Sequence, residues 1–124
     1  MEEETKIWLD EDGILRFKLG NMMNEETLKM LNTKFIEFGT KASGKIKVII
    51  DLSKITYKST INLRKNAIRI LKDTLKDPGY DKVAFFGGNM LSRTVVSFII
   101  TASTFKNIKI FKTEEDALKW LKEE

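Results

Sequence analysis

Two uninterrupted apolar segments constrain the fold of this chain more than any other feature. Residues 46–52 read IKVIIDL, and residues 81–88 read DKVAFFGG. A short apolar run without polar alternation is typical of a strand that is covered on both faces of its sheet. Such strands belong to parallel sheets with helices packed on them, so the two segments predict an α/β domain.

The segments around these two strands complete an alternating pattern. Residues 6–10 and 13–19 are rich in β-forming side chains that alternate with polar ones, and the turn between them ends at Gly13, which predicts an antiparallel hairpin. The other predicted elements are a helix over 24–39 ended by Gly39, a helix over 60–77, a helix over 89–104, a strand over 107–113 and a last helix capped by Thr113.

The expected fold follows from this order. It is a single α/β domain over residues 1–124, with a mixed five-stranded sheet and four helices. The N-terminal antiparallel hairpin is followed by a parallel βαβαβα arrangement, because strands that alternate with helices pair in parallel through right-handed crossovers.

The predicted third helix is apolar on two sides. Its core face is predicted to consist of Leu91, Val95, Phe98, Ile99 and Ala102. Val96 and Ile100 lie nearly opposite, and a helix with two apolar sides must bury both of them. Plain packing within the chain and a homodimer interface through Val96 and Ile100 are equally good explanations, and a hydrophobic ligand beneath the helix is a third.

The composition excludes several kinds of chemistry. The chain has no cysteine and no histidine, so disulfides, thiolate chemistry, imidazole metal sites and a Ser-His-Asp triad are all excluded. We therefore expect no catalytic residue, no metal and no cofactor. The acidic N-terminus is unlike a signal peptide, and the longest apolar stretch is far shorter than the ~20 residues of a membrane span. We expect a cytoplasmic protein without a transmembrane segment.

Positive charge is concentrated in one part of the chain. Residues 54–76 contain seven basic side chains and one acid, within a net charge of +4. The basic residues are Lys54, Lys58, Arg64, Lys65, Arg69, Lys72 and Lys76. A solvated helix face is the preferred interpretation, and an acidic protein partner is the next. Nucleic acid is not favoured, because no aromatic side chain is interleaved with these charges.

Polar residues and glycines follow the two buried strands. Because the carboxyl ends of parallel strands meet at one edge of a sheet, the residues after both strands should lie close together. The candidate ligand-binding or partner-binding residues there are Asp51, Ser53, Lys58, Ser59, Gly87, Gly88, Asn89 and Arg93. Gly87 and Gly88 would let backbone approach an anion, and Arg93 could close on it. A tight turn followed by a cap at Asn89 explains the same residues more simply.

The stretch DLSKITYKSTINL, residues 51–63, resembles the STAS family of anti-sigma-factor antagonists. Asp51, Leu52 and Ser53 match that family's Asp-Leu-Ser, and Ser59 and Thr60 match its hydroxyl pair. Lys58 stands where the family has an acid, and Ile61 stands where it has a glycine. KVAFFGGN with Arg93 downstream, and the ending ALKWL, are closer to the SpoIIAA-like (STAS/SEC14-related) offshoot.

This resemblance implies a regulatory function. In the antagonist family a partner kinase phosphorylates the first serine of the pair, which corresponds to Ser59. A phosphate there would add about −1.5 to −2 charges at a helix N-terminus, where backbone N–H groups favour an anion. The alternative, which we prefer at this point, is that Ser59 or Thr60 simply caps the predicted second helix.

We therefore expect a non-enzymatic binding domain of bacterial or archaeal signalling. Its partner would be a protein, either an acidic one or a regulatory kinase. Contact is expected through the hydroxyl-bearing loop and the basic helix, with Arg64, Lys65 and Arg69 at the interface. The alternative function is the binding of a small hydrophobic ligand or a lipid, which the resemblance to lipid-binding relatives suggests.

Overall fold

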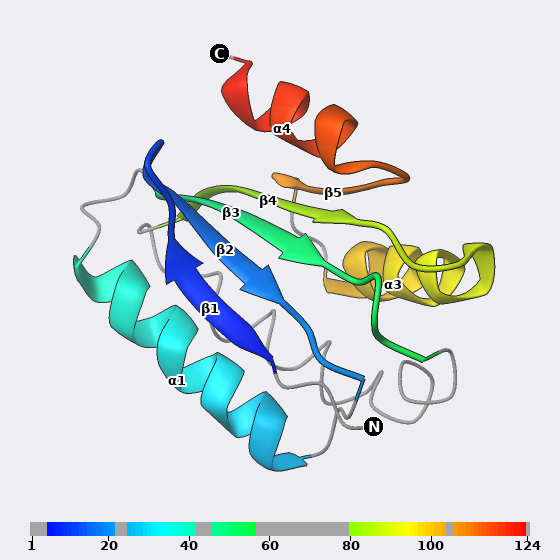
Figure 1. Ribbon diagram of the computed structural model, residues 1–124, viewed down its shortest axis with the longest axis horizontal. Helices are drawn as coiled ribbons and strands as arrows, with labels where there is room; N and C mark the ends of the chain where they lie inside the picture. The colour runs from blue at the N-terminus through cyan, green and yellow to red at the C-terminus, as the bar shows by residue number, and fades with distance from the viewer. Residues whose placement is uncertain (1–4, 22–24, 42–45, 57–79, 104–105, 124) are drawn as a thin grey trace.

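A computed structural model describes residues 5–21, 25–41, 46–56, 80–103 and 106–123. Its five strands form one sheet in the order β1-β2-β3-β4-β5 (Figure 1). The strands are β1 (Lys6–Leu9), β2 (Ile14–Lys18), β3 (Ile46–Asp51), β4 (Tyr80–Phe86) and β5 (Ile108–Phe111). The described helices are α1 (Glu25–Lys41), α3 (Met90–Ser103) and α4 (Glu114–Lys122).

The pairing of the strands is the predicted one. β1 pairs with β2 in antiparallel orientation, and β2, β3, β4 and β5 pair in parallel. The mixed five-stranded sheet with an N-terminal hairpin is therefore confirmed. The described residues contain three of the four predicted helices, and the predicted helix over 60–77 lies outside them.

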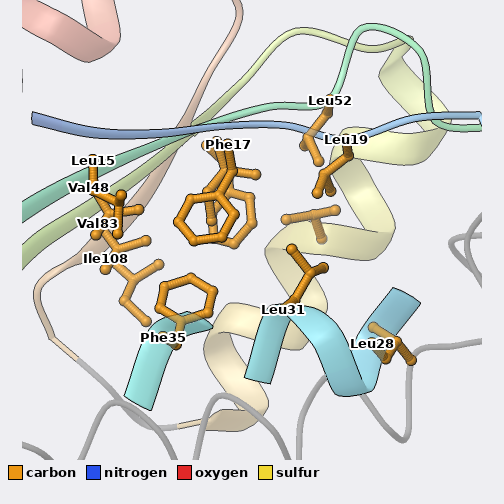
Figure 2. Close-up of a cluster of buried hydrophobic side chains, with 13 residues drawn as sticks. Leu15, Phe17, Leu19, Leu28, Leu31, Phe35, Val48, Leu52, Val83 and Ile108 are labelled. Atoms are coloured by element: carbon orange, nitrogen blue, oxygen red, sulfur yellow. The ribbon is translucent and has the colours of Figure 1, made fainter. Parts of the chain in front are cut away.

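Helices cover both faces of this sheet. α1 and α3 lie on one face, and α4 lies on the other (Figure 1). The larger core is on the α1 and α3 face, where alternate side chains of β2, β3 and β4 meet the inner sides of the helices (Figure 2). Its members include Leu15, Phe17, Leu28, Leu31, Phe35, Val48, Ile50, Val83, Phe85, Val96 and Ile108.

Aromatic packing joins α1 to the centre of this core. Phe17 is 1% exposed, and its ring stacks on that of Phe35 with centroids 4.6 Å apart. The Tyr80 and Phe35 rings make a T-shaped contact with centroids 5.5 Å apart, and the Tyr80 hydroxyl donates a hydrogen bond to the Phe35 carbonyl. These contacts fix α1 against β2 and β4, and they give the buried end of Tyr80 the polar partner that it needs.

The smaller core forms where α4 packs on the opposite face. Ala117 and Leu121 of α4 are fully buried against a patch that includes Ile14, Ile49 and Ala84. The predicted cap of this helix is confirmed, since the Thr113 hydroxyl accepts a hydrogen bond of 3.2 Å from the Asp116 N–H. β3 is therefore covered on both faces, as its uninterrupted apolar sequence predicts.

One predicted helix end is wrong. Gly39 was expected to end the first helix, but α1 continues through it to Lys41. A glycine terminates a helix by taking the left-handed conformation after the last turn. Gly39 instead remains inside the helical run, where it costs the helix roughly 1 kcal/mol relative to alanine.

The predicted division of the α3 faces is also wrong. Val96 is 5% exposed and packs in the larger core, where Ile100 is partly buried beside it. Leu91 and Phe98, which were predicted to face inward, are 55% and 63% exposed. The buried stripe includes Ser92, Val96 and Ile99, so the helix is rotated by about one residue from the predicted orientation. Val96 is covered by the chain's own core and is not available as an outer contact.

Candidate functional site

The candidate site lies where β3 and β4 end side by side. Their last residues, Asp51 and Phe86, are register partners, so the loops that follow leave the sheet at the same place. The Leu52 N–H donates a hydrogen bond of 2.9 Å to the Phe86 carbonyl and extends the pairing by one residue. We call the two loops, residues 51–53 and 87–89, the loop edge.

Asp51 organises the first of these loops. Its Oδ1 accepts a hydrogen bond of 2.8 Å from the Ser53 N–H, which bends the chain immediately after the strand. The turn continues with a bond of 3.2 Å from the Ile55 N–H to the Leu52 carbonyl. Leu52 stays in the core at 1% exposure, whereas Ser53 and Lys54 are exposed. Asp51 therefore shapes the turn that presents Ser53.

Gly87 and Gly88 form the second loop, and both have left-handed backbone conformations. Their φ angles are +85° and +74°, values that residues other than glycine rarely adopt. A Cβ atom on Gly87 would lie 3.5 Å from the Ser53 nitrogen and 3.6 Å from Asp51 Oδ1. A Cβ atom on Gly88 would lie 3.3 Å from the Leu52 carbonyl oxygen. The two loops thus touch through backbone, and the predicted proximity of Asp51, Ser53, Gly87 and Gly88 is confirmed.

Asn89 and Arg93 attach α3 to the glycine loop. Asn89 Oδ1 accepts a hydrogen bond of 2.8 Å from the Ser92 N–H, which is the predicted cap. Arg93 Nη1 donates a bond of 2.5 Å to the Gly88 carbonyl. The guanidinium therefore folds back onto the loop and holds it against the helix. The sequence also suggested that Arg93 could bind an anion. To do so, its guanidinium would have to keep or give up the hydrogen bond to the Gly88 carbonyl.

Ser92 is a buried residue that sequence reasoning missed. It is 0% exposed, and its Oγ makes no hydrogen bond within the described part of the chain. A Cβ atom added to Gly88 would lie 3.7 Å from the Ser92 Cβ, which places Ser92 directly beside the glycine loop. A serine three residues after an N-cap asparagine is an ordinary helix residue in sequence, and nothing local marks it as buried.

The outward side of α3 is uncharged and carries large apolar side chains, with the hydroxyl residues Ser97 and Thr101 also exposed along it. Met90, Leu91 and Phe98 are 71%, 55% and 63% exposed, and Thr94 is exposed between them. These four residues are called the α3 outer face. The Thr94 hydroxyl donates to the Met90 carbonyl at 2.9 Å, which leaves its methyl group for contact. The α3 outer face is therefore more apolar than its composition suggests, and it begins directly at the loop edge.

Several predicted site residues lie outside the described part of the chain. They are Lys58, Ser59, Thr60, Arg64, Lys65 and Arg69. Their predicted roles in phosphorylation and partner binding stay predictions. The binding of a hydrophobic ligand beneath α3 also stays a prediction.

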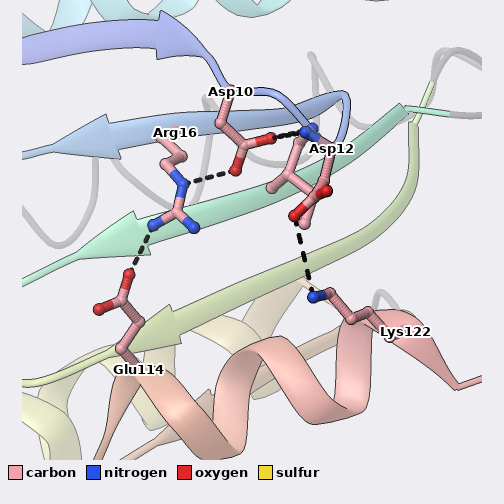
Figure 3. Close-up of polar contacts among 6 residues, drawn as sticks. Asp10, Asp12, Arg16, Glu114 and Lys122 are labelled. Carbon is pink, nitrogen blue, oxygen red and sulfur yellow. Dashed lines mark hydrogen bonds and ion pairs between the residues drawn. The ribbon is translucent and has the colours of Figure 1, made fainter.

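A second polar cluster joins the β1–β2 hairpin to α4 (Figure 3). Arg16 Nε donates to Asp10 Oδ2 at 2.7 Å, and its Nη1 donates to Glu114 Oε1 at 2.5 Å. Asp10 Oδ1 also accepts bonds of 2.9 Å from the N–H groups of Asp12 and Ile14. A weaker ion pair of 3.9 Å links Lys122 to Asp12.

The electrostatics of this cluster are those of a structural ion pair. Burial raises the pKa of Asp10, but the hydrogen bond from Arg16 and those from backbone N–H groups outweigh it, so the pKa lies below its ordinary value. Burial lowers the pKa of Arg16, but its bonds to Asp10 and Glu114 raise it by more, so the pKa lies above its ordinary value. Both groups remain ionised at neutral pH, and neither is set up as a general acid or base. Within the described ranges, no three acidic side chains gather as metal ligands.

The glycine loop can be tested by comparing Gly88→Ala with Gly13→Ala. Both glycines have φ near +75°, so each alanine should cost about 1–2 kcal/mol of unfolding free energy through the left-handed backbone alone. A Cβ on Gly13 meets nothing within 4 Å, whereas one on Gly88 crowds the Leu52 carbonyl. We expect Gly88→Ala to cost about 1 kcal/mol more in urea unfolding. Equal losses would contradict the close approach of the two loops.

The Asp10 cluster gives a prediction for acid stability. A carboxyl whose folded pKa is lowered contributes stability that is complete above its ordinary pKa of about 4 and is lost as pH falls through the folded value. We expect Asp10→Asn to lower the unfolding free energy at pH 7 by about 1–2 kcal/mol, and the deficit to shrink toward pH 3. Asp12→Asn is the control, since the Asp12 side chain is 66% exposed and its pair with Lys122 is long. A deficit that stays constant with pH would argue against the ionised bond.

The sequence is similar to one known protein family. A family model described as SpoIIAA-like matches residues 14–122, which is nearly the whole chain. Searches of curated proteins and of solved structures returned no match. The match includes β2 through α4 and therefore the loop edge and the α3 outer face. No helix in the described part of the chain is long and apolar enough to cross a membrane.

Proposed function

The chain belongs to the SpoIIAA-like family, and from that premise we propose that it is a regulatory domain that binds a protein partner through the loop edge and the α3 outer face. SpoIIAA-like domains are generally regulatory and non-catalytic, and they act through protein interactions. The absence of histidine and cysteine from the sequence agrees with a binding role. The partner belongs to a signalling pathway of a bacterium or an archaeon.

The observation that carries this proposal is the exposure of Met90, Leu91 and Phe98 on one helix. Large apolar side chains that stay in solvent on one side of a helix mark a surface for another macromolecule. Arg93 is the one charged residue of α3, and it is turned toward the Gly88 carbonyl. Burial of the exposed face therefore desolvates no charged group, and the exposed Ser53 and Lys54 of the neighbouring loop supply polar groups.

The loop edge adds rigidity to this surface. Asp51 holds the turn at Ser53, and Asn89 and Arg93 hold the start of α3 against the glycine loop. The bond from the Leu52 N–H to the Phe86 carbonyl joins the two loops where they leave the sheet. A preformed surface loses little conformational entropy on binding. This rigidity favours recognition of a folded partner by shape.

A photo-crosslinking experiment tests the surface. A benzoyl-phenylalanine at position 91 should capture the partner in cells, and mass spectrometry should identify it. Phe98→Asp should then weaken binding of the purified partner at least about tenfold, because the interface would have to bury a carboxylate. Ile36→Asp is the matched control: Ile36 is also a large exposed apolar residue on a helix, at 51%, but lies on α1. If Ile36→Asp weakens binding as much as Phe98→Asp, the assigned surface is wrong.

We further propose that phosphorylation of Ser59, or of Thr60 beside it, switches this interaction. The support is the resemblance of DLSKITYKST to the antagonist pattern and the position of Asp51 and Ser53 at the loop edge. We propose that the segment after Ser53 takes part in the contact, so that a phosphate on it adds charge that the partner would have to desolvate. Incubation with ATP and an extract of the source cells should give a phosphopeptide at Ser59 or Thr60 that Ser59→Ala removes or shifts to Thr60. Unmodified peptides at full coverage would refute the switch.

A further inference from the structure

The two margins of the sheet differ in how they are protected. At one margin, α3 and α4 both pack against β5, and three exposed lysines surround the strand: Lys106, Lys109 and Lys112. At the other margin, β1 is the outermost strand and packs mainly on β2 (Figure 1). Trp8 and Leu9 of this strand are 43% and 54% exposed. Lysines on an edge strand discourage pairing with another chain, and exposed apolar residues permit it. Within the described residues, β1 is therefore the margin open to a further strand.

The hydrogen bonds of the hairpin determine which backbone groups β1 offers. The Asp10 N–H donates to the Ile14 carbonyl at 3.0 Å, so residues 10 and 14 form a hydrogen-bonded pair. Such pairs alternate along an antiparallel ladder, which makes Trp8 and Lys6 the next residues bonded to β2. The N–H and C=O groups of Ile7 and Leu9 therefore point away from β2, toward the open margin.

The charges along β1 make this margin complementary to itself. Lys6 lies at one end, directly across from Lys18 of β2, and neither lysine makes an ion pair in the described part of the chain. Like charges in directly opposite positions are destabilising. The other end is the acidic hairpin tip, where Glu11 and Asp12 are exposed. In an antiparallel pair of identical strands, the basic end of each chain meets the acidic tip of the other.

We infer that two copies of this chain associate through β1, which forms an antiparallel pair with the β1 of the second copy about a two-fold axis at Trp8. In this register Ile7 bonds Leu9 of the second copy in both directions, which satisfies the outward backbone groups. The two Trp8 residues face each other on the axis, in the closer non-hydrogen-bonded position. Lys6 lies across from Asp10 at the acidic tip. The two sheets become one continuous sheet.

A cysteine pair tests the register, and the chain has no cysteine of its own to interfere. Two residues on the axis have Cα atoms about 4.5 Å apart, within the range of a disulfide. Residues one position away from the axis are about 7–8 Å from their symmetry mates, which is too far. Trp8→Cys should therefore form a disulfide-linked dimer under mild copper-phenanthroline oxidation, and Leu9→Cys, at a similarly exposed site, should not. Equal yields, or a higher yield for Leu9→Cys, would overturn the inference.

Sedimentation tests the association without a covalent bond. We expect the wild-type chain to show a concentration-dependent monomer–dimer equilibrium, since a strand of four residues offers a small interface. Lys6→Glu should raise the dissociation constant about tenfold, because two attractive contacts become repulsive by symmetry. Lys29→Glu changes the same charge on the exposed side of α1 and should leave the constant unchanged. A wild-type protein that stays monomeric at 1 mM, or equal effects of the two variants, would refute the dimer.

Discussion

The burial of β3 on both faces is the constraint on which the rest of the structure depends. Val48 and Ile50 are covered on one side and Ile49 on the other, all at no more than 4% exposure. The enclosed stretch from Val48 to Ile50 cannot hold a polar side chain without an internal partner, and Lys47 stands before it at a half-buried position. The polar groups therefore emerge where the strand ends, at Asp51. β4 is buried in the same way and ends beside β3, since Phe86 is the register partner of Asp51. The loop edge is therefore a consequence of this burial.

Much of this arrangement could be predicted from the sequence because its signals are local. Uninterrupted apolar runs identify β3 and β4, the turn at Gly13 identifies the hairpin, and Asn89 and Thr113 identify two helix starts. The proximity of Ser53 to Gly87 then follows from parallel pairing alone. The rotation of α3 could not be obtained in this way, because the helix is apolar on two sides and both orientations satisfy the periodicity. The structure has Ser92, Val96 and Ile99 on the buried side and Leu91 and Phe98 in solvent.

The contacts that sequence reasoning missed join residues far apart in the chain. Arg16 and Glu114 are separated by 98 positions, and neither is unusual in its own segment. Arg16 lies on the sheet face that α4 partly covers, so its charge requires partners there, and Asp10 and Glu114 supply them. The N-cap region of α4 is acidic, which suits the helix dipole as well as the arginine. One pair of contacts therefore stabilises the hairpin, the helix start and the position of α4 over the sheet.

The two proposed contact surfaces lie at opposite margins of the sheet, and this separation has a physical consequence. α3 packs against β5, whereas β1 lies beyond β2 and β3 on the other side. Association through β1 would leave the α3 outer face of each copy uncovered and place the two faces at the far ends of one continuous sheet. A partner with two binding modules, or a partner that is itself dimeric, would then bind the second face at a raised effective concentration. A weak edge contact could in this way increase the avidity of a regulatory domain without covering its recognition surface.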